Sequence, residues 1–188
     1  KMFFPAGFYY KTFMWPPSFW YKIYEPFIRM AAGFGEASIK HDKERYEHKY
    51  EYCDLLVTGS GPSGLASAYA AAKNGARVIL AEDKPRYGGS LLTSDVNIGN
   101  QTGVEWSEKI IAELKSMSNV TVKNRSQVFG YYDHNMLVMS ERISDHLPKT
   151  QKYLPKQRLW YIRANEVLIS SGSIERPLVF GNNDTPGV

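Results

Sequence analysis

The chain has 188 residues, with 23 lysines and arginines against 19 acidic residues and a formal net charge of +4. This length suffices for one domain with a hydrophobic core and an appended arm. The single cysteine, Cys53, excludes a disulfide framework and a dithiol redox pair within the chain. Because the basic residues are scattered among acidic ones, we expect no nucleic-acid partner, and without a signal peptide we expect a cytoplasmic protein.

The N-terminal segment 3–27 holds twelve of the 26 aromatic residues of the chain. Two lysines, a glutamate and four prolines interrupt it, so it is too polar and too broken to cross a membrane. An arm this aromatic should bury against its own domain or against a partner chain, and the sequence does not separate these alternatives. We expect residues 1–51 to form this arm and a charged, solvated linker or helix at 36–51.

An apolar run at 52–58 leads directly into a G-x-G-x-x-G pattern made by Gly59, Gly61 and Gly64. The run is typical of a buried parallel strand, and apolar residues then recur at helical spacing over 63–74. The first glycine allows a tight turn, the second lets the backbone approach a pyrophosphate, and the third permits close packing of helix on strand. The order of strand, turn and helix predicts a dinucleotide site, whereas the glycine pattern alone would be weak.

The residues around this turn fit the same interpretation. Pro62 suits the first helical turn, and the N–H groups near Ser63 and the positive helix end would face an anion. Further on, Gly89, Ser90 and Leu91 belong to a second glycine-containing loop that would approach a phosphate closely. The alternative for this loop is an ordinary turn.

A second strand is expected at 77–82, and its last residue, Glu82, lies eighteen positions after the final glycine of the pattern. Glu82 is placed to accept hydrogen bonds from the adenosine ribose hydroxyls, and Asp83 adds negative charge. This charge disfavours a 2′-phosphate and so favours NAD or FAD over NADP. Lys84 and Arg86 are close enough to leave that choice open, and the pattern alone does not separate NAD from FAD.

The rest of the chain predicts an α/β domain over 52–188 with an added β-meander. We expect a helix at 105–117 and strands at 120–123, 126–132, 136–143, 158–163 and 167–170, with turns at 133–135 and 148–155. A meander before the last central strand is unlike a plain dehydrogenase domain. It favours the Rossmann-like dinucleotide-binding fold of the two-dinucleotide flavoproteins, incomplete here at its C-terminus.

No constellation of side chains predicts catalysis or metal binding. His41 and His48 lack the carboxylates or cysteines that would complete a metal site. Asp133 and His134 are interpreted as turn residues. We therefore assign no catalytic residue and no metal ligand.

Several blocks of sequence resemble the alpha subunit of heterotetrameric sarcosine oxidase, over almost the whole chain. They include WPPSFWYKIYEPFIRMAAGFG, DLLVTGSGPSGLASAYAAAKNGARVILAED, GGSLL and SSGSIERPLVFGNNDTPGV. The last block has Ser170 and Ser171 where related flavoproteins have Ala-Thr, and we expect no consequence because both pairs are small. The resemblance implies a fragment, with a ferredoxin-like region before it and a folate-binding, aminomethyltransferase-like domain after it.

The resemblance also implies a function. Enzymes of this family oxidatively demethylate sarcosine to glycine, pass the one-carbon unit to tetrahydrofolate and produce hydrogen peroxide. By this resemblance the chain binds NAD rather than FAD, Val128 contacts the adenine, and Gly172 completes the floor under the cofactor. FAD, FMN and tetrahydrofolate would lie elsewhere in a complex with beta, gamma and delta subunits, and this chain alone would be inactive.

Two other interpretations stay open. The dinucleotide could be a structural scaffold without a redox role. The chain could also be the FAD- or NAD(P)-binding domain of another amine- or opine-oxidising flavoprotein or of an NAD(P)H reductase, which would be yellow.

Overall fold

The computed structural model describes residues 15–33, 35, 38–148, 153–173 and 178–181. The chain divides into two compact units, Lys1–Lys43 and Glu44–Val188. The start of the expected aromatic arm, residues 3–14, lies outside the described residues, and so does the middle of the expected loop at 148–155.

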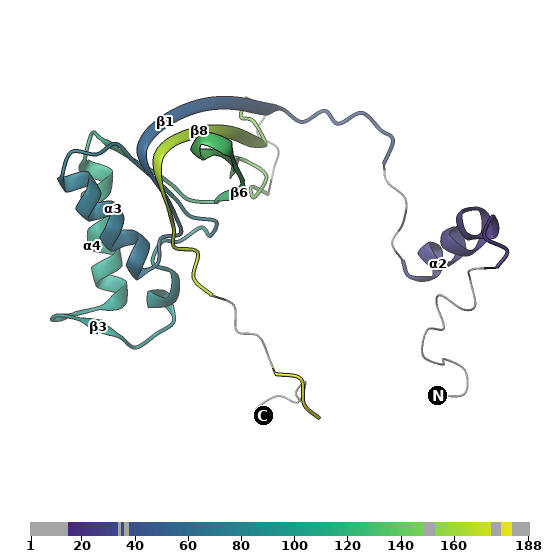
Figure 1. The fold of residues 1–188 in the computed structure, drawn as a ribbon, viewed down its shortest axis with the longest axis horizontal. Helices are drawn as coiled ribbons and strands as arrows, with labels where there is room; N and C mark the ends of the chain where they lie inside the picture. The colour runs from purple at the N-terminus through teal and green to yellow at the C-terminus, as the bar shows by residue number, and fades with distance from the viewer. Residues whose placement is uncertain (1–14, 34, 36–37, 149–152, 174–177, 182–188) are drawn as a thin grey trace. The chain divides into compact units, whose positions relative to one another are not determined.

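In the described part of the first unit, a π-helical turn, η1 (Trp20–Tyr24), continues directly into helix α2 (Glu25–Ala31; Figure 1). The sequence predicts that prolines interrupt a helix here, yet Pro26 lies within this helical segment. Pro26 has no N–H to donate to the preceding turn, and the helix accommodates it directly after the wider π-helical turn η1. Among the described residues, no helix is long and apolar enough to span a membrane.

The second unit contains a six-stranded sheet in the order β5-β2-β1-β8-β7-β6. The strands β5, β2, β1 and β8 are parallel, and β8, β7 and β6 form an antiparallel meander. This topology confirms the predicted α/β fold with its meander. The elements are β1 (Tyr46–Thr58), α3 (Pro62–Lys73), β2 (Val78–Ala81), α4 (Gly103–Ser116), β5 (Val120–Lys123), β6 (Ser126–Tyr132), β7 (Met136–Arg142) and β8 (Gln157–Ile169).

Strand β1 is longer than the sequence predicts, because it begins inside the segment expected to be a solvated linker or helix. It pairs with β8 at twelve positions, and the two strands curve side by side in Figure 1. Aromatic and charged residues alternate along its first half, which places them on opposite faces of the sheet. One of these charged side chains forms an ion pair between neighbouring strands: the Glu47 carboxylate lies 2.9 Å from the Arg158 guanidinium of β8.

Strand β8 is continuous, although the sequence predicts two strands separated at residues 164–166. The polar Asn165 breaks the apolar pattern without breaking the strand. Its side chain accepts a hydrogen bond from the Tyr52 hydroxyl at 2.8 Å and donates one to Asp54 at 3.2 Å. These bonds satisfy the amide at the surface of the sheet, so the backbone pairing continues past it.

Successive residues of the parallel strands alternate between two cores. Helices α3 and α4 lie side by side on one side of the sheet (Figure 1) and bury Val57 and Leu80 against Leu65 and Leu114. Leu56 points to the opposite face. The core on that face also contains Cys53, Ile79, Ala81, Leu137, Met139, Ile162 and Ala164.

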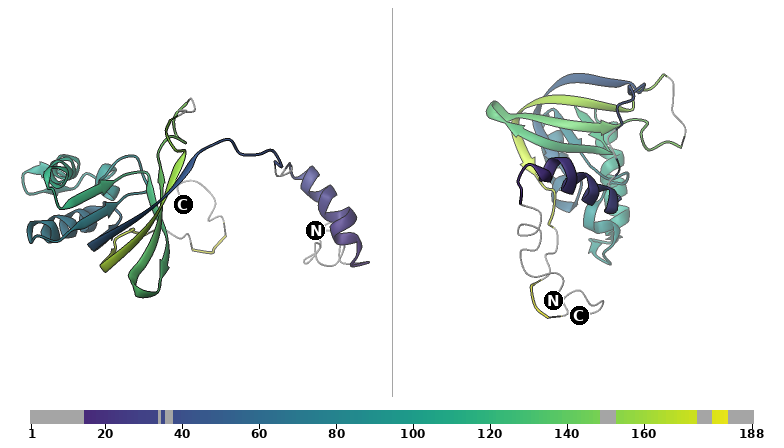
Figure 2. Two further views of the ribbon diagram at one scale, coloured as in Figure 1. Left: turned by 90° about the horizontal axis from the view of Figure 1, so that it is seen from above. Right: turned by 90° about the vertical axis from the view of Figure 1, so that its right-hand side faces the viewer.

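The sheet bends back on itself, so that β5 meets β7 and β8 although other strands separate them in the sheet order. The curvature of the long strands is visible in Figure 2. Lys123 of β5 lies 3.8 Å from the Glu141 carboxylate and 4.0 Å from the centre of the Trp160 ring. Glu141 in turn accepts hydrogen bonds from the Trp160 indole at 2.6 Å and from Arg158 at 3.3 Å. This half-buried cluster joins the two ends of the bend.

Shorter elements connect these parts. The 3₁₀ turn η3 (Asp133–Asn135) occupies the predicted turn between β6 and β7. The 3₁₀ turn η2 (Gly89–Leu92) and the two-residue strands β3 (Asn97–Ile98) and β4 (Gln101–Thr102) are absent from the sequence prediction, because such short elements carry no periodicity. Helix α4 begins two residues before the predicted helix, fixed by reciprocal hydrogen bonds between Thr102 and Glu105.

Candidate functional site

A cavity of about 1030 Å³ lies at the carboxyl ends of the parallel strands. Thr58, Ala81 and Ile169, the last residues of β1, β2 and β8, all line it. Open α/β sheets bind their ligands at this edge. The cavity is therefore the candidate site, and the glycine-rich turn lies within it.

Two glycines of the turn are required by the packing of the protein itself. Gly59 has a φ of +98°, and a Cβ there would overlap the carbonyl oxygen of Ser170. A Cβ on Gly64 would overlap the carbonyl oxygen of Gly59. These positions serve the tight turn and the close approach of α3 that the sequence predicts.

Gly61 is different, because the protein has no steric need for it. Its φ of −67° and ψ of −178° suit any residue, and a Cβ there would meet nothing within 4 Å. The residue lines the cavity. A closely bound diphosphate needs backbone that is open to the cavity, with no Cβ in its way, and Gly61 provides both.

Helix α3 presents its N-terminus to the cavity. Pro62 is in its first turn, Gly61 caps it without a side-chain hydrogen bond, and both Pro62 and Ser63 line the cavity. The first N–H groups of a helix have no intrahelical acceptors. Together with the positive end of the helix dipole they favour an anion.

Glu82 is the buried acid of the site, with 6% of its surface exposed. Its Oε2 accepts hydrogen bonds from the Ser60 N–H at 2.8 Å and from the Ser60 hydroxyl at 2.5 Å. Its Oε1 accepts the N–H of Lys84 at 3.0 Å. The protein therefore holds the carboxylate in place at the end of β2, where a ribose hydroxyl is expected.

The charged side chains that follow Glu82, Asp83 and Lys84, are more exposed than Glu82 itself. Lys84 lies 3.4 Å from the Asp83 carboxylate, and both side chains are at least half exposed. Burial raises the pKa of Tyr87 to about 12, and the Glu82 charge contributes as the second cause. Negative charge is thus fixed inside the site, and the lysine is paired at its rim.

The second glycine loop packs on the first. The N–H of Gly88 bonds to the carbonyl oxygen of Ser60 at 3.0 Å, and a Cβ on Gly89 would lie 2.8 Å from the Cα of Gly61. Gly89 and Ser90 line the cavity. Leu91 is instead buried in the protein, beside Gly103 at the start of α4.

The wall opposite the turn comes from β6 and the floor from the end of β8. Val128 lines the cavity together with Tyr131, near a β-bulge that shifts the strand register between Val128 and Gly130. On the floor, the Ser170 hydroxyl bonds to the carbonyl oxygens of Thr58 at 2.9 Å and Gly59 at 3.0 Å. Ser170 therefore holds the turn in place through these hydrogen bonds, whereas the sequence predicts only that this residue must be small.

The structure brings most of the predicted site residues together. Gly64 and Leu91 do not line the cavity, and act through packing behind it. The predicted residues that line it are Gly59, Gly61, Pro62, Ser63, Glu82, Asp83, Lys84, Gly89, Ser90, Val128 and Gly172.

Sequence reasoning missed Ser60 and most of the β6 residues that line the site. Ser60 sits at a variable position of the glycine pattern, and its bond to Glu82 joins residues 22 positions apart. No local signal reports such a contact. The other missed lining residues include Thr93, Ser126, Gln127, Phe129, Tyr131, Leu137, Ser171 and Ser173.

The arrangement is suited to binding an anionic ribonucleotide. It combines helix N–H groups, close glycine backbone and one buried carboxylate. Within the described ranges, no group of three histidine, cysteine or acidic side chains is placed to hold a metal ion.

Comparison with known families gives a match to the family described as FAD dependent oxidoreductase. The match covers residues 54–150, more than half of the chain, and includes the turn, Glu82 and strands β6 and β7 of the meander. The chain belongs to the FAD-dependent oxidoreductase family. Oxidoreductases of this family carry a dinucleotide cofactor, which agrees with the cavity described above.

Curated relatives of this oxidoreductase confirm the resemblance to sarcosine oxidase alpha subunits. Sarcosine oxidase subunit alpha of Rhizobium meliloti (strain 1021) is 49% identical over 97% of this chain and 18% of its own length. That of Corynebacterium sp. (strain P-1) is 38% identical over 83% of this chain and 16% of its own length. The chain thus spans about a fifth or less of the length of these two alpha subunits.

A solved structure supports the fold of this oxidoreductase domain. L-proline dehydrogenase from P. horikoshii superimposes with a TM-score of 0.55 at 20% identity, over 81% of this chain and 28% of its own. At this identity the likeness concerns the fold alone. It agrees with the sheet and helices of the second unit.

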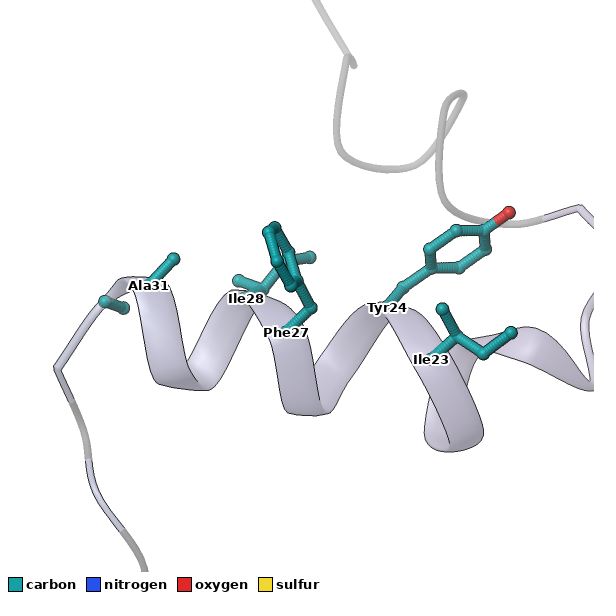
Figure 3. A pocket seen from close by; sticks show the side chains of 6 residues that line it. Ile23, Tyr24, Phe27, Ile28 and Ala31 are labelled. Atoms are coloured by element: carbon teal, nitrogen blue, oxygen red, sulfur yellow. The ribbon is translucent and has the colours of Figure 1, made fainter.

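A separate cavity of about 440 Å³ lies on the first unit, along η1 and α2. Figure 3 shows Ile23, Tyr24, Phe27 and Ile28 along one helical segment. The lining side chains are apolar apart from the Tyr24 hydroxyl. This surface therefore lacks the charges that a nucleotide requires.

Proposed function

We propose that this chain is the NAD-binding part of a sarcosine-oxidising alpha subunit. The observation that carries the proposal is the open space beside Gly61, in a cavity whose buried acid is Glu82. The pyrophosphate of NAD would lie against the N-terminus of α3, and its adenosine ribose would lie beside Glu82. The identity to sarcosine oxidase alpha subunits supports the choice of enzyme.

In this proposal the whole enzyme oxidatively demethylates sarcosine to glycine. Tetrahydrofolate accepts the one-carbon unit, and oxygen is reduced to hydrogen peroxide. FAD, FMN and the folate are bound elsewhere in a complex with beta, gamma and delta subunits. This chain contributes binding and orientation of a dinucleotide, and its residues supply no proton donor or acceptor to the reaction.

FAD in the same cavity is the second candidate, and the family match favours it. Both dinucleotides carry an adenosine diphosphate half, so the turn and Glu82 would serve either one. Nucleotide released by heat from the purified protein, identified by mass, separates the two. We expect NAD. Release of FAD would overturn the NAD assignment, and failure of both to bind in a calorimetric titration would overturn the dinucleotide site.

The redox role of the bound NAD needs a different experiment. Sarcosine is added to the complete complex while the absorbance of reduced nicotinamide is followed. Reduction of the bound nicotinamide would support a direct hydride role. An unchanged spectrum would instead support the scaffold interpretation.

A further inference from the structure

The helical segment made by η1 and α2 carries an apolar groove along one side. The residues that line this cavity of about 440 Å³, here called the α2 groove, are Ile23, Tyr24, Phe27, Ile28, Ala31 and Ala32. Figure 3 shows the labelled side chains among them rising from the same side of the helix. They form two rows of residues four positions apart. Such rows bound the kind of groove into which a ridge of a second α-helix packs.

The helical segment buries no side chain of its own. None of the residues of η1 and α2 is buried, and in the groove Ile23 and Phe27 are 49% and 65% exposed. A helical segment as short as this one is marginally stable in water unless its apolar face packs on another surface. The α2 groove therefore requires a surface that covers it.

The charges of the segment indicate what this covering surface is like. Arg29 donates a hydrogen bond to the Glu25 carboxylate at 2.7 Å, so these two charges satisfy each other. Among the described residues Lys22 forms no ion pair, and the lining of the groove is uncharged. The complementary surface is thus apolar, with an acidic residue at its edge.

A second copy of this chain fits the groove poorly. Its helical segment has no free acid to place opposite Lys22, because its one acidic residue, Glu25, is paired with Arg29. An interface that is stable by itself also needs about 20 to 30 residues from each partner, far more than the groove provides. The groove is therefore suited to be one part of a larger assembly of different chains.

We propose that the α2 groove binds an amphipathic α-helix of a different subunit, which carries an acidic residue close to Lys22. The inference rests on the proposed function, in which this chain is part of an alpha subunit within a complex. The similarity to sarcosine oxidase alpha subunits extends over the helical segment, since it spans 97% of the chain. Phe27 is the exposed aromatic side chain of the groove and acts as its anchor.

The first test uses the full alpha subunit, produced together with its partner subunits. Phe27→Asp places a charge in the groove, and we expect it to raise the dissociation constant of the complex, measured by mass photometry, about tenfold or more. Tyr21→Asp is the matched control, because Tyr21 belongs to the same helical segment, is 80% exposed and does not line the groove. We expect the control to assemble like the unaltered subunit. Unchanged assembly of Phe27→Asp would overturn the proposal, and so would an equal loss in both variants.

Cross-linking identifies the occupant, and it keeps the proposal testable if Phe27→Asp does not fold. A photoreactive benzophenone amino acid replaces Phe27 in the complete complex, and the cross-linked peptides are identified by mass. We expect these peptides to come from a helix of a different subunit. Cross-links to a second alpha subunit, cross-links within the same alpha subunit, or no cross-links would each overturn the proposal.

The nucleotide content of the complex separates this inference from the proposed function. NAD released from each complex is identified by mass. An assembled complex without NAD would contradict NAD binding and not the role of the groove. Phe27→Asp that retains NAD but fails to assemble would support the groove as an interface between subunits, because its dinucleotide site is then intact.

Discussion

Within the glycine turn, the fold requires glycine at one position, and a bound ligand explains it at another. Gly64 has no room for a Cβ, whereas Gly61 has open space and ordinary backbone angles. Gly61→Ala should keep the free energy of unfolding within about 1 kcal/mol of the original, because alanine fits the native backbone. It should nevertheless weaken dinucleotide binding, since the new methyl group projects into the cavity. Urea unfolding and calorimetric titration measure the two effects.

Gly64→Ala provides the contrast for this experiment. Its Cβ would overlap backbone, so we expect the unfolding free energy to fall by about 2 kcal/mol or more. If Gly61→Ala were equally destabilised, the open space would not be explained by a ligand. Full affinity in Gly61→Ala would likewise contradict the pyrophosphate assignment.

The Asp54 carboxyl group should make the stability of the domain depend on pH in the acid range. Hydrogen bonds from the Arg77 side chain and then from its backbone lower the pKa of Asp54 from 3.8 to about 2. A carboxyl with a lowered folded pKa stabilises the protein above its unfolded pKa, and this contribution is lost as the pH falls through the folded value. Asp54→Asn should therefore be less stable than the original at neutral pH. Its stability should also fall less steeply between pH 3.8 and about 2. Urea midpoints measured across this range test the effect, and parallel acid profiles would contradict it.

At the scale of elements, the cluster around Glu141 joins the two ends of the bent sheet. Lys123 and Arg158 are mostly buried against its carboxylate. Glu141→Gln removes the carboxylate beside Lys123, whereas Arg158 keeps its pairing with Glu47, and we expect the change to lower the unfolding free energy by about 2 kcal/mol. The exposed Glu108, 3.8 Å from Arg86, is the control, because Glu108→Gln should cost less than about 0.5 kcal/mol. Similar costs for both variants, measured by denaturant unfolding, would show that the bend does not depend on this cluster.

The sequence predicts elements best where an apolar run or a helical spacing is uninterrupted. Strands β2 and β5 and both helices of the second unit follow from such patterns, whereas β8 is predicted as two strands because polar residues interrupt its apolar run. The start of β1 does not follow from such a pattern, because alternating tyrosines and charges look like a solvated segment until β8 lies beside them. The same limit applies to the site. Glu82 is found by its spacing from the turn, whereas Ser60 and the β6 wall are brought to it by tertiary contacts.

At the scale of the whole molecule, the second unit has its own cores. Both core clusters consist of residues from 53 to 164, all within Glu44–Val188. We therefore expect a chain that begins at Glu44 to fold. Burial raises the pKa of the Cys53 thiol to about 12, so a thiol reagent should react with it slowly at about pH 8. The labelling rate should be equally slow in the shortened and the full chain, and rapid labelling of the shortened chain would show that the first unit is needed for folding.

The long pairing of β1 with β8 has a consequence for how such chains vary in length. Because side chains alternate along a strand, removing one residue from β1 would exchange the two faces of every position beyond the deletion. The exposed tyrosines would exchange faces with the charged residues, and Leu56 and Val57 would exchange the two cores that they now fill. We expect insertions and deletions among related sequences to be absent between Tyr46 and Thr58 and to gather in the connection between β7 and β8.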